Sequence, residues 1–145
     1  QKSSSAPTAT VAPSAGGQIL IEPRSQEIGQ IRMKDGLKEL VYTLKNTGSG
    51  PLTITGMQTS CMCTTVILKV ADTLSPKFGM ASHGSNPKGW LQVLKPGETG
   101  SLLVTFDPNA HGPAGVGAMS RTITIRSNDD KSLQTQVFFN GSVIP

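Results

Sequence analysis

The fold class is decided by residues 40–54, which read LVYTLKNTGSGPLTI. Large apolar side chains recur at every second position from Leu40 to Leu44, the pattern of a strand with one buried face. The Asn46–Pro51 segment that follows holds two glycines and a proline and predicts a turn. Leu52 then begins a second run rich in β-branched residues. The stretch therefore predicts two consecutive strands joined by a turn.

Similar short apolar segments lie on both sides of this pair. The chain has 16 glycines and 10 prolines and shows no convincing helical period. These features predict an all-β fold, an antiparallel two-sheet sandwich of seven or eight strands. Besides the strand around residues 40–44, strands are expected near residues 18–21, 27–31, 52–57, 64–70, 102–106, 123–125 and 137–143.

The first 17 residues differ in composition from the rest. They read QKSSSAPTATVAPSAGG and hold one charge and one sizeable apolar side chain, so alone they cannot offset their ordering entropy. We expect a low-complexity arm over residues 1–17 and one domain over residues 18–145, with a loop insertion near residues 71–92. The arm resembles the mature end left after signal-peptide removal, or an arbitrary chain boundary. We therefore expect a secreted, extracellular or periplasmic protein.

Several classes of protein are disfavoured by charge and motif content. Lysines and arginines number 13 against 9 acidic residues, but they are spread singly and aromatics make up 4% of the chain, so a nucleic-acid partner is not expected. No apolar run approaches the roughly 18 residues of a membrane span. Nucleophile-elbow, P-loop and dinucleotide-binding motifs are missing. We expect no enzyme activity and identify no small-molecule substrate.

Four motifs occur in this order along the chain: Asn46-Thr-Gly48, Cys61-Met-Cys-Thr64, Pro96-Gly-Glu98 and Ser127-Asn-Asp129. Together they resemble a bacterial exported Ig-like family of unknown function, similar to Hydin-type and major-sperm-protein sandwiches. The resemblance covers about residues 19–144 and implies an Ig-like sandwich that serves as a binding or structural module. Met62 departs from it, since the family commonly has glycine there.

Chemistry, if the chain has any, is centred on Cys61 and Cys63. In an extended strand the two side chains point the same way, with Cα atoms ~6.6 Å apart at ~3.3 Å rise per residue. That separation lies at the edge of the range for a disulfide. Two thiolates facing one way instead form half of a site for copper(I) or zinc(II). An oxidised or buried cysteine pair is the alternative.

Two histidines and a methionine are candidates to complete such a site. His83 lies in the apparent insertion, Met80 precedes it by three residues, and His111 lies in a loop after a predicted strand. We therefore predict metal binding by Cys61, Cys63, His83, His111 and Met80, with copper or zinc as the bound metal. The alternative is that the histidines cap loops through hydrogen bonds.

Assembly is the second functional expectation. The arm, with Val11, Ala12 and Pro13, is expected to add a strand to a sheet edge of a neighbouring copy, giving a homo-oligomer or filament; packing on its own domain is the alternative. Trp90 either pins the insertion to the sandwich or anchors a partner. The sequence thus favours a non-catalytic secreted structural module, with an exported copper- or zinc-binding protein as the alternative.

Overall fold

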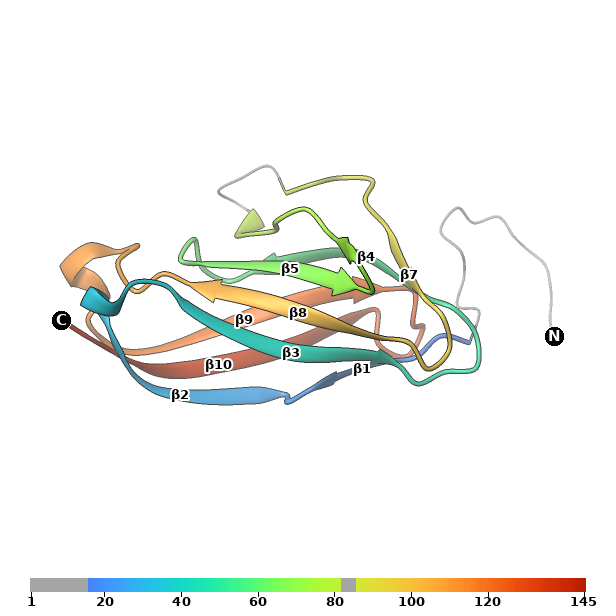
Figure 1. The fold of residues 1–145 in the computed structure, drawn as a ribbon, viewed down its shortest axis with the longest axis horizontal. Helices are drawn as coiled ribbons and strands as arrows, with labels where there is room; N and C mark the ends of the chain where they lie inside the picture. The colour runs from blue at the N-terminus through green and yellow to red at the C-terminus, as the bar shows by residue number, and fades with distance from the viewer. Residues whose placement is uncertain (1–15, 82–85) are drawn as a thin grey trace.

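Two five-stranded sheets face each other in the computed structural model, which describes residues 16–81 and 86–145 (Figure 1). The first sheet has the order β1 (Ile19–Glu22), β3 (Lys38–Asn46), β8 (Thr99–Phe106), β5 (Thr64–Val70), β6 (Thr73–Leu74). The second has the order β2 (Ser25–Arg32), β10 (Gln134–Ile144), β9 (Gly117–Ser127), β4 (Leu52–Thr59), β7 (Gln92–Leu94). Short 3-10 turns include η1 (Met33–Asp35) and η3 (Gly112–Gly115).

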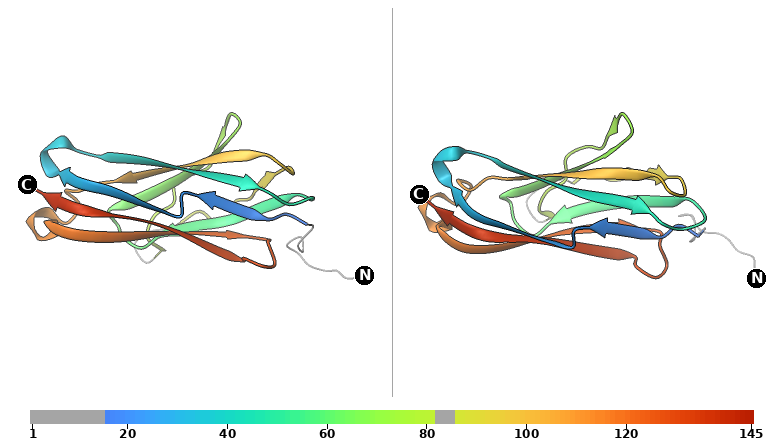
Figure 2. Two further views of the ribbon diagram at one scale, coloured as in Figure 1. Left: turned by 90° about the horizontal axis from the view of Figure 1, so that it is seen from below. Right: turned by 60° about the horizontal axis from the view of Figure 1, so that its bottom comes forward.

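The predicted all-β, Ig-like sandwich is confirmed, with two differences in detail. The described chain forms ten strands rather than seven or eight, because short strands such as β6 and β7 form at the edges of the sheets. One pair is parallel: β2 runs beside β10 in the same direction. The chain passes from one sheet to the other near Pro23 without reversing, so β1 pairs with β3 and β2 pairs with β10 (Figure 2).

The core lies between the sheets and follows the predicted alternation. Leu40, Tyr42 and Leu44 of β3 are buried, whereas the intervening side chains are exposed. The Tyr42 hydroxyl donates to the carbonyl oxygen of Phe138 on β10 at 2.6 Å and so joins the two sheets. Burial raises the pKa of Tyr42 to about 12, because the phenolate would lose its hydration.

Asn46 organises one end of the sandwich. Its buried side chain accepts from the backbone N–H groups of Gln18 and Gly48, at 3.1 and 2.9 Å. It donates to the carbonyls of Gly50 and Leu94, at 2.8 and 2.9 Å. The predicted turn is therefore held by one side chain whose amide has all its main hydrogen-bonding positions filled.

The described chain makes contact with the sandwich from Gly16 onward. The Gly16 carbonyl accepts from the backbone N–H groups of Ser49 and Gly50, at 3.1 and 3.3 Å. Gly48 allows this approach, since a Cβ at that position would collide with the Gly16 carbonyl. Among the described residues, no helix has the length and apolar character that a membrane crossing needs.

The residues that follow β6 pair with β5, near one edge of the first sheet. Val66 and Phe78 exchange two backbone hydrogen bonds of 2.9 Å each, and Phe78 is buried. The partly buried Trp90 packs on Phe78 with ring centroids 5.2 Å apart. These contacts correspond to the pinning role weighed for Trp90, and a partner-binding role for this residue stays a prediction.

Candidate functional site

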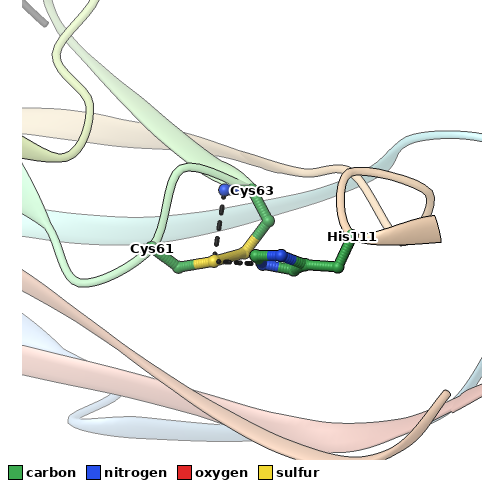
Figure 3. Close-up of side chains that lie close together, drawn as sticks. All are labelled: Cys61, Cys63 and His111. Carbon is green, nitrogen blue, oxygen red and sulfur yellow. Dashed lines mark hydrogen bonds between the residues drawn. A yellow bond between two sulfur atoms is a disulfide. The ribbon is translucent and has the colours of Figure 1, made fainter. Parts of the chain in front are cut away.

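Cys61 and Cys63 lie in the tight turn between β4 and β5. Thr64 N–H donates to the Cys61 carbonyl at 3.1 Å, and the buried Thr59 hydroxyl contacts the carbonyls of Cys61 and Thr64 at 3.0 and 2.8 Å. This turn holds the two Cα atoms 5.1 Å apart, and the sulfurs form a disulfide (Figure 3). The cysteines therefore lie in a turn and not in the extended strand that was expected, and the structure has the oxidised pair that the sequence left open as the alternative, because the turn brings the Cα atoms within disulfide range.

The disulfide packs against the loop that follows β8. His111 lies in this loop, just before η3, and its Nε2 is 3.1 Å from Cys61 Sγ (Figure 3). Cys61 Sγ also accepts from the backbone N–H of Cys63 at 3.2 Å. The Cys63 carbonyl accepts from Asp107 N–H at 2.8 Å, which joins the turn to the end of β8.

Arg121 is a site residue that the sequence reasoning missed. Its Nε donates to Cys63 Sγ at 3.1 Å, and one of its terminal nitrogens donates to the Ser120 carbonyl at 2.9 Å. Burial lowers the pKa of Arg121 from its usual value, although an arginine stays protonated at neutral pH. A signal was present: Arg121 stands at an inward position of β9, between the buried residues Met119 and Ile123.

Three potential metal ligands are gathered at this turn. The two sulfurs and a nitrogen of His111 all lie within 4.8 Å of one another, with the cysteines buried and His111 exposed. Two thiolates and one imidazole are a donor set that suits copper(I) or zinc(II). The residues fit a metal only in the reduced form, because a disulfide has no thiolate to offer.

The other predicted ligands and contacts are placed as follows. Met80 forms a backbone bridge with Thr59, so its chain segment runs beside the strand that leads to Cys61. A thioether contribution from Met80 stays a prediction. His83 and the arm residues Val11, Ala12 and Pro13 lie outside the described residues.

The disulfide closes a very small ring, with a single residue between its cysteines. In the chain-entropy account, a disulfide that closes a loop of three residues stabilises the folded protein by about 1.6 kcal/mol. This is roughly half the value for a loop of 15 residues. Such a crosslink does little for the stability of a sandwich that already has a continuous core.

Sequence comparison relates part of the chain to a known family. Residues 19–76, from β1 past the cysteine turn, match the sequence model of a family described as "Protein of unknown function (DUF1573)". Neither His111 nor Arg121 falls within the matched range. No curated protein matches the chain.

Structural comparison gives similar sandwiches in larger proteins. A protein of unknown function from Porphyromonas gingivalis W83 matches 87% of this chain at 17% identity, with a TM-score of 0.64. The secreted serine protease VesC from Vibrio cholerae matches 88% of this chain at 12% identity, with a TM-score of 0.54. A family 123 glycoside hydrolase from Clostridium perfringens matches 83% of this chain at 9% identity, with a TM-score of 0.55.

The matched regions are only parts of those proteins. This chain spans 46% of the Porphyromonas gingivalis protein and 23% of each of the two enzymes. Identities this low show a shared fold and nothing about activity. The chain is thus an Ig-like β-sandwich, and its N-terminal part resembles a family of unknown function.

Proposed function

We propose that this protein is an exported module that binds a soft metal ion, copper(I) in preference to zinc(II), through reduced Cys61 and Cys63 and through His111. The observation that carries the proposal is the gathering of these three donors within 4.8 Å, from segments 50 residues apart in the sequence. Export is supported by the disulfide itself, since such bonds persist in oxidising compartments.

The surroundings of the donors also suit a bound ion. A copper(I) ion held by two thiolates and an imidazole has a net charge of −1, and the Arg121 guanidinium beside Cys63 Sγ would offset it. The buried sulfurs would be protected from bulk solvent, while the exposed His111 leaves a side for the ion to enter. Met80 and His83 are further candidate ligands.

The test is a competition assay on the full chain. The protein is reduced with a phosphine and titrated with copper(I), without oxygen, against a chromophoric chelator; zinc(II) is assayed in parallel. We expect one copper per chain, loss of binding in Cys61→Ser and Cys63→Ser, and weaker binding in His111→Ala. Met62→Ala is the matched control and should bind normally, because Met62 is half exposed at the tip of the turn. Equal binding by wild type and Cys61→Ser would refute the proposal.

Assembly by strand addition is a second proposal, and it concerns the other end of the molecule. It is supported by an open sheet edge at β7, where Leu91 and Val93 are exposed, and by the 15 residues that precede Gly16. The proposed occupant of such an edge is the arm of a second copy, which would pair through its backbone. Deleting residues 1–15 should then reduce a native oligomer or filament to folded monomers, as seen by light scattering and electron microscopy. Unchanged assembly after the deletion would refute this proposal.

A further inference from the structure

The two sulfur atoms of the disulfide are surrounded by groups that can donate hydrogen bonds. Cys63 Sγ faces Arg121 Nε at 3.1 Å and the Thr64 hydroxyl at 3.3 Å. Cys61 Sγ faces the backbone N–H of Cys63 at 3.2 Å and His111 Nε2 at 3.1 Å. A sulfur in a disulfide is a weak acceptor, whereas a thiolate beside a cation is strongly stabilised. These contacts therefore favour the reduced state over the oxidised one.

We propose that Cys61–Cys63 is a redox-active disulfide that accepts two electrons from a dithiol, with Arg121 stabilising Cys63 as the leaving thiolate. This inference goes beyond metal binding and does not require a metal. The small ring supports it, because a crosslink over one residue has little structural value. A disulfide whose reduced form is stabilised is an oxidant toward other thiols.

The attack is directed to Cys61 by the surroundings of the two sulfurs. Arg121 and Thr64 both contact Cys63 Sγ, whereas no arginine or lysine is recorded in contact with Cys61 Sγ among the described residues. The leaving sulfur should be the one whose thiolate is better stabilised, since exchange is faster with such a leaving group. Arg121 supplies a permanent positive charge at Cys63, so Cys63 leaves and Cys61 is attacked.

The exchange balances in two steps. A thiolate of the dithiol attacks Cys61 Sγ, the Cys61–Cys63 bond breaks, and Cys63 departs as a thiolate beside Arg121. The second thiol of the dithiol, after losing its proton, then attacks the dithiol sulfur that is bonded to Cys61. This breaks the mixed disulfide and releases Cys61, which takes up a proton from solvent. The dithiol becomes a disulfide, its two electrons reduce the cysteine pair, and its two protons end on Cys61 and in solvent.

The test is an exchange equilibrium without metal. The oxidised full chain is equilibrated with dithiothreitol redox buffers, and free thiols are counted by alkylation and mass spectrometry. Arg121→Gln should shift the equilibrium toward the disulfide by at least about tenfold, the value of a hydrogen bond to a charged group, and Arg121→Lys should shift it less. Arg126→Gln is the matched control, an exposed arginine of the same strand that donates to Gln58, and should leave it unchanged.

A second measurement needs no variant and serves if Arg121→Gln fails to fold. Brief treatment of the oxidised wild type with a monothiol, followed by acid quench and fragmentation, should place the adduct on Cys61. An adduct on Cys63, or an Arg121→Gln equilibrium no different from that of Arg126→Gln, would overturn the inference. Failure here leaves the metal proposal standing, since that assay uses protein reduced by a phosphine. Failure of metal binding likewise leaves the exchange result unchanged.

Discussion

Replacing Asn46 by alanine should remove most of the stability that this end of the sandwich adds to the domain. The side chain is fully buried and makes four hydrogen bonds, two as acceptor and two as donor. At a net value of about 1 kcal/mol per bond, Asn46→Ala should lower the free energy of unfolding by about 4 kcal/mol. That is a large part of the roughly 5–15 kcal/mol that stabilises a typical domain.

Urea denaturation measures this loss. At a slope of about 2 kcal/mol per molar urea, the midpoint should fall by about 2 M. Far-ultraviolet circular dichroism reports the sheets, and the fluorescence of Trp90, the single tryptophan, reports the segment packed on Phe78. Asn46→Asp separates the two halves of the effect: it keeps both acceptors but loses the donors to Gly50 and Leu94, and should cost at least about 2 kcal/mol.

Asn109→Ala is the matched control. Asn109 is exposed and its side chain donates to the Met33 carbonyl at 2.8 Å, so its loss should cost less than about 1 kcal/mol. If Asn46→Ala lowers the free energy of unfolding by no more than Asn109→Ala does, the hydrogen-bonded amide is not what holds this turn, and the reasoning fails.

Three further predictions concern the core and the disulfide. Tyr42 has a pKa of about 12 when folded against about 10 when unfolded, so its stabilising effect is complete below pH 10 and is lost as the pH rises through 12. Tyr42→Phe should lack this part of the loss of stability at alkaline pH. Phenolate absorbance follows the titration of the single tyrosine in the wild type, and a titration near pH 10 would contradict the assignment. Phe78→Ala should lower the free energy of unfolding by about 3–5 kcal/mol and shift the Trp90 emission to the red. An unchanged emission would show that the Trp90 ring does not need Phe78 to stay packed. Replacing both Cys61 and Cys63 by serine should lower the unfolding free energy by no more than about 2 kcal/mol in urea, and a loss above 4 kcal/mol would make the disulfide a structural crosslink.

The strands were predictable because their burial is local and periodic. The β3 pattern places every second side chain in the core, and the apolar run near residues 64–70 coincides with β5. The Lys95–Glu98 turn has a Pro-Gly pair, which is typical of turns and could also have been predicted. Glu98 N–H donates to the Lys95 carbonyl at 2.9 Å, and Gly97 takes the positive φ of 81° that this turn needs. The parallel pairing of β2 with β10 could not be predicted from the sequence, because nothing in a short strand specifies which sheet it joins.

The sequence by itself determined that the chain is an all-β sandwich, and it predicted Cys61 and Cys63 as the centre of any chemistry. Only the tertiary structure decided that the two cysteines share a turn and a bond, and which side chains surround them. His111 and Arg121 reach the sulfurs from 50 and 58 residues away, through the packing of the β8 loop and β9 against the turn. Periodicity encodes which face of a strand is buried, but contacts between distant segments depend on how the two sheets close over one core.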